Sequence, residues 1–154
     1  VDGKADEKSI LEKLSKYGIK DPGTKNKDTV SITLWGTGSP YREFLYVEDL
    51  AEACVFLLQN INFEDLVKVS KSSADKEIKN THINIGTGKD LTIKELATMV
   101  KEIVGFQGEI IWDNTKPDGT MRKLMDVSKI NQLGWKEKID VEKGIRLVYD
   151  IYKK

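Results

Sequence analysis

Cysteine and histidine are almost absent from this 154-residue chain, which contains one of each, Cys54 and His82. A single cysteine excludes an internal disulfide and a metal site built from several cysteines, and a single histidine makes a zinc cluster implausible. No apolar run approaches the roughly 20 residues needed to cross a bilayer, and the N-terminus shows no signal-peptide pattern. We therefore expect a soluble, cytoplasmic protein that binds no metal and no membrane.

The chain also lacks an excess of either charge. It has 25 Lys and Arg residues against 25 Asp and Glu residues, so its formal net charge is zero. This balance argues against bulk electrostatic binding to nucleic acid or to an anionic membrane.

The length fits one compact domain, and the opening VDGKADEKSILEKLSKYG has no initiator methionine. We expect a piece of a longer protein.

Apolar periodicity predicts alternating helices and strands. The predicted helices cover residues 6–17, 48–60, 92–104 and 128–133, and a last helix follows Asp140 with Val141, Ile145, Val148 and Tyr152 on its apolar face. The predicted strands cover residues 30–35, 82–86 and 109–112, and polar loops cover 19–29, 62–80 and 113–120. This order predicts an α/β domain with a short sheet of about three strands flanked by helices.

Two glycine-containing turns resemble nucleotide-binding loops only in part. Residues 36–41 (GTGSPY) and 86–91 (GTGKDL) both lack the third glycine of the dinucleotide fingerprint, and the second lacks the Ser or Thr that a P-loop places after its lysine. We interpret both segments as tight strand-end turns.

Catalytic groups are also scarce. Cys54 falls on the predicted inward face of the 48–60 helix, which also carries Leu50, Leu57 and Ile61, so we expect an inert buried thiol. His82 opens a predicted strand and is interpreted as structural. The carboxylates are scattered, and no pair is marked as an acid/base couple.

The remaining candidates are residues suited to binding a ligand rather than to catalysis. Trp35 ends the first predicted strand beside glycines, where an indole either packs in the core or stacks on a base or sugar face. Arg42 has a planar guanidinium suited to a phosphate, or it pairs with a neighbouring glutamate. Residues 116–123 (KPDGTMRK) combine cations with the carboxylate of Asp118, which suits a diphosphate and a hydroxyl, or form an ordinary charged loop.

Three ordered segments resemble GDP-L-fucose synthases, which are extended short-chain dehydrogenases/reductases. They are WGTGSPYREFLYVEDLAEA, HINIGTGKDLTIKELA and KPDGTMRKLMDVSKINQLGW. The resemblance covers residues 30–154 and implies the C-terminal substrate domain. Residues 1–29, a charged helical segment and linker, do not match and are interpreted as an insertion.

The resemblance also implies a function. Such an enzyme epimerises a GDP-keto-sugar at C3 and C5 and reduces its C4 ketone with NADPH, which binds a Rossmann half that this chain lacks. By resemblance, Trp35 and Arg42 (WG-x-G-x-x-x-RE) and Lys123 (KPDGT-x-RK) contact the GDP-sugar, and Asp118 contacts a sugar or ribose hydroxyl. The catalytic residues lie upstream, so we expect no catalytic residue in this chain, no activity from it alone, and a homodimer for the full-length enzyme.

Two alternatives stay open at this point. One is a related nucleotide-sugar epimerase/reductase that acts on another sugar, such as a GDP-keto-heptose. The other is a non-catalytic interaction module whose charged N-terminal helix docks a partner, and a native N-terminus at Val1 would favour it.

Overall fold

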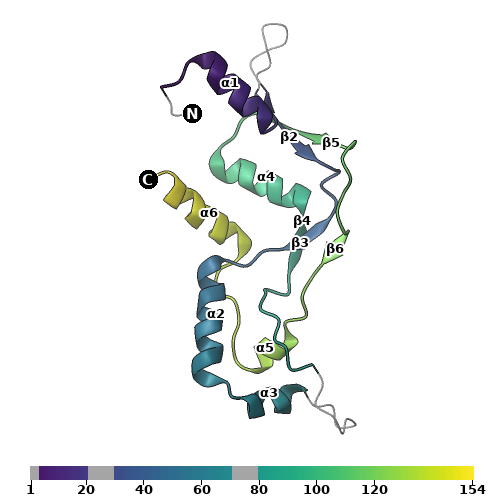
Figure 1. The fold of residues 1–154 in the computed structure, drawn as a ribbon, viewed down its shortest axis with the longest axis vertical. Helices are drawn as coiled ribbons and strands as arrows, with labels where there is room; N and C mark the ends of the chain where they lie inside the picture. Colours follow the sequence, from purple (N-terminus) through teal and green to yellow (C-terminus); the bar gives the residue numbers. More distant parts are fainter. Residues whose placement is uncertain (1–3, 21–29, 71–79) are drawn as a thin grey trace. The chain divides into compact units, whose positions relative to one another are not determined.

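The computed structural model describes residues 4–20, 30–70 and 80–154 (Figure 1). It confirms the predicted α/β class, with helices around short strands. The strands form two three-stranded sheets where the sequence predicted one. The chain divides into two compact units, each built from two separate stretches: unit 1 comprises Val1–Pro40 and Thr92–Met121, and unit 2 comprises Tyr41–Leu91 and Arg122–Lys154.

Unit 1 begins with helix α1 (Glu7–Lys16), as predicted. The carboxylate of Asp6 caps the helix by accepting the N–H of Ser9 at 3.0 Å. Gly18 follows the helix with φ +76°, a conformation that favours glycine. The polar linker predicted from residue 19 therefore starts with a strand instead, and its remainder, residues 21–29, lies outside the described residues.

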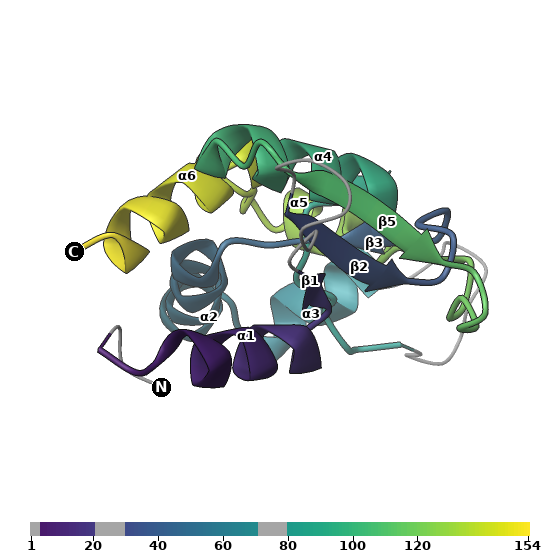
Figure 2. The same ribbon diagram turned by 90° about the horizontal axis from the view of Figure 1, so that it is seen from above.

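The sheet of unit 1 has the order β1-β2-β5. Strand β1 (Ile19–Lys20) pairs antiparallel with β2 (Ser31–Trp35), and β2 pairs in parallel with β5 (Glu109–Asp113). Figure 2 shows the arrows of β2 and β5 side by side and pointing the same way. The register places Trp35 beside Asp113, so β2 and β5 end together.

Helix α4 (Ile93–Val104) completes unit 1 and confirms the predicted capping box. The hydroxyl of Thr92 accepts the Glu95 N–H at 3.1 Å, and the Glu95 carboxylate accepts the Thr92 N–H at 2.7 Å. Gly105 ends the helix in the left-handed conformation, with φ +71°. These local signals explain why both helix ends could be read from the sequence.

The sheet of unit 2 has the order β4-β3-β6. Strand β3 (Tyr41–Glu43) pairs in parallel with β6 (Arg122–Lys123), and β4 (Asp90–Thr92) lies on the other side of β3. The strand predicted at 82–86 is wrong, because this segment forms no ladder with any described strand.

The core of unit 2 contains Ala53, Ile130 and Trp135. Ala53 lies on α2 (Val47–Asn60), and Ile130 lies on α5 (Ser128–Gln132). The half-buried apolar side chains around them are Leu45, Phe56, Leu57, Ile83, Ile85 and Val127. The alternating isoleucines of the 82–86 segment thus pack inward although their backbone is not in a described sheet.

Helix α2 buries a different face from the predicted one. Leu50 and Cys54 were expected in the core, yet both are exposed, while Asp49 and Ala53 are buried. Hydrogen bonds set which face of the helix is buried, because the Asp49 carboxylate accepts the backbone N–H groups of residues 138–139 at 3.0 and 2.9 Å. Hydrophobic periodicity cannot register a buried carboxylate of this kind.

Helix α3 (Phe63–Ser70) lies in the segment 62–80, which was predicted as a loop with at most one weak helical turn. The Asp65 carboxylate accepts the Asn62 N–H at 3.1 Å, and Lys68 pairs with Asp65 on the next turn. Residues 71–79 of the predicted loop lie outside the described residues.

The last helix, α6 (Val141–Tyr152), begins at the predicted cap, where Asp140 accepts the Lys143 N–H at 2.8 Å. Val148 and Tyr152 were expected on a packed face but are exposed, whereas Gly144 is buried. No helix in the described part of the chain has the length and apolar character needed to cross a bilayer.

Candidate functional site

Two of the four predicted contact residues, Arg42 and Lys123, lie beside each other in unit 2. They occupy paired positions of the parallel strands β3 and β6. Neighbouring strands are about 4.8 Å apart and paired residues point to the same face, so the ladder places two cations next to one another. Arg42 is half-buried and Lys123 is exposed. Two adjacent cations suit an anion with several oxygens, such as a diphosphate.

Glu43, which sequence reasoning missed, holds this region together. Its Oε1 accepts the N–H of Thr87 at 2.5 Å and of Gly88 at 2.7 Å, and its Oε2 accepts the N–H of Met125 at 3.1 Å. The carboxylate therefore joins β3 to the GTG turn and to the segment that follows β6. Its sequence signal was its place as the last residue of the WG-x-G-x-x-x-RE motif, directly after Arg42.

Arg122, a third cation close to Arg42 and Lys123 in the sheet, is paired with a carboxylate. Its guanidinium donates two hydrogen bonds to Asp90, Nε to Oδ2 at 2.6 Å and Nη2 to Oδ1 at 3.1 Å. The Asp90 side chain is only 7% exposed. The hydrogen bond and the charge of Asp90 raise the pKa of Arg122 above its ordinary value. This bidentate pair ties β6 to β4, the two outer strands of the sheet.

Trp35 lies at the end of β2 in unit 1 and is 75% exposed. The indole of Trp35 is therefore exposed in this chain rather than packed in the core. The ammonium of Lys116 lies 5.7 Å from the centroid of the indole ring, within the range of a cation–π contact. An exposed indole beside a cation suits stacking on a base or a sugar face.

Asp118 belongs to the same unit and binds the turn that follows Trp35. Its Oδ1 accepts the Thr37 N–H at 2.8 Å, and its Oδ2 accepts the Thr37 hydroxyl at 2.6 Å. These bonds, the hydroxyl first, lower the pKa of Asp118 below its ordinary value. Each carboxylate oxygen keeps a second lone pair, so contact with a ligand hydroxyl remains compatible with this geometry.

The first glycine turn follows a strand, as predicted, whereas the second follows the segment 82–86, which is not a strand; neither turn fits a nicotinamide dinucleotide. Gly36, Gly38 and Gly88 have positive φ, and a strand rather than a helix follows each of the two turns. A Cβ on Gly36 would lie 2.3 Å from Asp118, and one on Gly38 would lie 2.6 Å from the Trp112 ring. Side chains of this chain thus fill the space that a cofactor pyrophosphate would need.

Three further candidate groups lie in the part of the chain that the structure describes. Cys54, expected to be buried, is a free and exposed thiol. His82 is exposed, and its backbone carbonyl accepts a hydrogen bond from the ammonium of Lys129 at 2.8 Å. The sequence contains one Tyr-x-x-x-Lys spacing, at Tyr149 and Lys153. The Lys153 amine lies 4.3 Å from the centroid of the Tyr149 ring. That contact places the amine over the ring at the end of α6, which is a cation–π pair rather than a catalytic one.

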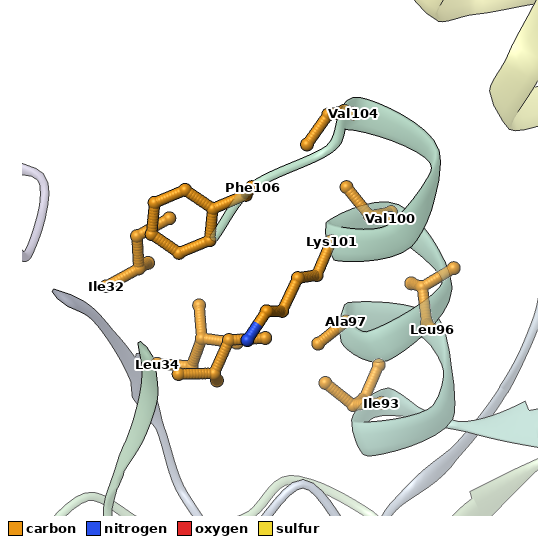
Figure 3. A pocket seen from close by; sticks show the side chains of 10 residues that line it. Ile32, Leu34, Ile93, Leu96, Ala97, Val100, Lys101, Val104 and Phe106 are labelled. Carbon is orange, nitrogen blue, oxygen red and sulfur yellow. The ribbon is translucent and has the colours of Figure 1, made fainter. Parts of the chain in front are cut away.

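An apolar groove in unit 1 is also a poor diphosphate site. It has a volume of about 390 Å³ and lies between α4 and the β2/β5 strands. Figure 3 shows Lys101 reaching from α4 toward Leu34, among apolar side chains that include Ile32, Val100 and Phe106. The ammonium of Lys101 is the one charged group in this otherwise apolar lining, and it cannot supply the several convergent polar groups that a nucleotide-sugar requires.

Comparison with known proteins agrees with the motifs. Residues 11–86 match the sequence model of the NAD dependent epimerase/dehydratase family. The chain therefore contains part of a domain of that family. The chain is 50% identical to GDP-L-fucose synthase 1 of Arabidopsis thaliana over 123 residues, which is 80% of this chain and 33% of that protein.

Two solved structures from Campylobacter jejuni are also similar. A GDP-6-OMe-4-keto-L-xylo-heptose reductase has 46% identity and a TM-score of 0.81, over 97% of this chain and 39% of that one. A GDP-D-glycero-L-gluco-heptose synthase, solved in the presence of NADPH, has 45% identity and a TM-score of 0.78, over 97% of this chain and 38% of that one. The chain spans about a third of the length of the curated relatives it matches.

Proposed function

We propose that this chain is the GDP-sugar-binding, C-terminal portion of an NADP-dependent GDP-L-fucose synthase-like epimerase/reductase. The observation that carries the proposal is the 50% identity to a GDP-L-fucose synthase. The pairing of Arg42 with Lys123 on adjacent strands supports it, because those are the cations that the motifs assign to the substrate. In this proposal they contact the diphosphate, and Trp35 and Asp118 also contact the substrate.

The proposed reaction has two stages, C3/C5 epimerisation of a GDP-keto-sugar and reduction of its C4 ketone by NADPH. The glycine turns of this chain do not fit the dinucleotide, so we assign NADP(H) to a Rossmann part of the longer protein. The chain contributes binding and orientation of the substrate. It is proposed to act in the cytoplasm, within a full-length homodimer.

The test of this function is Arg42→Ala in the full-length protein. Loss of a charged hydrogen bond to phosphate is worth roughly 1.5–3 kcal/mol, so the KM for the GDP-keto-sugar should rise about 10- to 150-fold. Arg146→Ala is the matched control, because Arg146 is exposed and its guanidinium bonds to Glu142 on the same helix. An unchanged KM in the Arg42 variant would remove Arg42 from the substrate site.

A related reductase acting on a GDP-keto-heptose is the second candidate. The 46% identity and TM-score of 0.81 with a GDP-heptose reductase favour it. Turnover of GDP-keto-sugars that differ only beyond C5 separates the two candidates, since a heptose enzyme should prefer the longer sugar.

The chain alone should catalyse neither stage. Mixed with NADPH and the GDP-keto-sugar, it should show no substrate-dependent loss of NADPH absorbance, whereas the full-length protein should. The remaining alternative, a non-catalytic interaction module, requires a native protein that begins at Val1. Intact mass of the protein from its source tests that alternative directly.

A further inference from the structure

The carboxylate of Glu43 lies in a site formed by backbone N–H groups. Three N–H groups converge on it, those of Thr87, Gly88 and Met125, and the Thr87 hydroxyl approaches Oε1 at 3.2 Å. A Cβ on Gly86 would lie only 2.5 Å from Oε1 of Glu43. Gly86 therefore leaves the space that the carboxylate fills.

This site lies close to Arg42 and Lys123, the two cations that are proposed to contact the substrate. Glu43 directly follows Arg42 on β3, and Met125 comes two residues after Lys123 on β6. The ladder between the two strands has two residue pairs, Tyr41 with Arg122 and Arg42 with Lys123. So short a ladder holds its register weakly, and the Glu43 bond to Met125 adds a fixed link just beyond it.

We propose that Glu43 is a positioning residue that sets the spacing between Arg42 and Lys123. It does so by binding the backbone after β6 with Oε2 while Oε1 anchors β3 to the GTG turn. This role rests on the proposed function, in which both cations contact the substrate diphosphate. Glu43 touches neither the substrate nor the reacting atoms in this proposal.

Oε1 and Oε2 of Glu43 bind different segments, which makes a selective test possible. In Glu43→Gln, the amide oxygen can still accept from Thr87 and Gly88, but the NH₂ group cannot accept the N–H of Met125. The variant therefore cuts the link to β6 and keeps the link to the turn. Glu95→Gln is the matched control, because both bonds that Glu95 accepts from Thr92 come to one oxygen, Oε2, which a glutamine can replace.

Three measurements on the full-length protein are compared for Glu43→Gln and the control. We expect the KM for the GDP-keto-sugar to rise about 5- to 10-fold with kcat within about 3-fold, from the loss of one charge-assisted bond that orders the cations. Amide hydrogen exchange at Met125 should become about 10-fold faster. The double variant with Arg42→Ala should be no worse than Arg42→Ala alone, because both changes affect one clamp.

The outcomes separate this inference from the proposed function. An unchanged KM in Arg42→Ala refutes the proposed function whatever Glu43→Gln does. An unchanged exchange rate at Met125, or an additive double variant, refutes the positioning role even if Arg42→Ala raises the KM. A Glu43→Gln protein that unfolds, or that loses kcat and keeps its KM, also refutes it, because the carboxylate would then serve the fold rather than the spacing of the cations.

Discussion

The buried carboxylate of Asp49 is the contact whose removal should cost the most stability in unit 2. Asp49 is 3% exposed, and its Oδ2 accepts the backbone N–H groups of Lys138 and Ile139 at 3.0 and 2.9 Å. These bonds fasten α2 to the segment that leads into α6. Asp49→Ala leaves two backbone donors without their acceptor.

The expected magnitude follows from those two donors. Each unsatisfied buried donor costs about 1–3 kcal/mol, and water can reach the partly exposed side of Lys138, so we expect Asp49→Ala to lower the free energy of unfolding by about 2–4 kcal/mol. Asp49→Asn should cost much less, because its one amide oxygen can accept both N–H groups, as Oδ2 does now.

Chemical denaturation of the full-length protein, followed by a signal from Trp135 in the same core, measures these changes. Glu48→Ala is the control, because Glu48 is exposed in the same first turn of α2 and shares the favourable interaction with the helix dipole. It should change the free energy of unfolding by no more than about 0.5 kcal/mol. If Asp49→Ala lowers the free energy of unfolding no more than Glu48→Ala does, the two backbone hydrogen bonds do not stabilise the fold.

Two further predictions concern unit 1. Thr92→Ala removes the hydroxyl that accepts the Glu95 N–H, so the free energy of unfolding should fall by about 1 kcal/mol, measured by urea denaturation with Thr92→Ser as the variant that restores the cap. Thr37→Val removes the hydroxyl that most lowers the pKa of Asp118, so that pKa should move up toward 3.8 in a carboxyl NMR titration while the pKa of Asp126 stays in place. Because the pKa of Asp118 is depressed in the folded chain, its contribution to stability is present above about pH 4 and is lost as the pH falls below it. If the free energy of unfolding falls with decreasing pH in the same way for the wild-type protein and for Thr37→Val, this assignment is contradicted.

Local sequence signals predicted the helix ends well. The capping box at Thr92 and Glu95, the cap at Asp140 and the glycine after Val104 are all confirmed. Each of these motifs satisfies backbone groups within a few residues, so the signal and the structure are on the same stretch of chain. The parallel pair of strands at 31–35 and 109–113 was also predicted as two strands, although the sequence did not indicate that they pair.

Predictions that needed a distant partner failed more often. The segment 82–86 alternates like a strand but finds no described partner, and Leu50 was assigned to the core although the buried face of α2 is the one that carries Asp49. In both cases the deciding hydrogen bonds involve residues far away in the sequence. Hydrophobic patterning records which side chains avoid water, and it does not record which backbone group will meet a carboxylate.

The amino-acid sequence by itself determined the class of fold, the capped helices and the first glycine turn, because these depend on local propensity or on short ordered patterns. The roles of the motif residues Trp35, Arg42, Asp118 and Lys123 come from the family resemblance and stay predictions. Only the tertiary structure decided that Arg42 and Lys123 are neighbours, that Arg122 is occupied by Asp90, and that Glu43 joins three segments. The physical reason is that a strand ladder and a shared carboxylate bring together residues about 80 positions apart, and the free energy of such contacts depends on geometry that no local stretch of sequence contains.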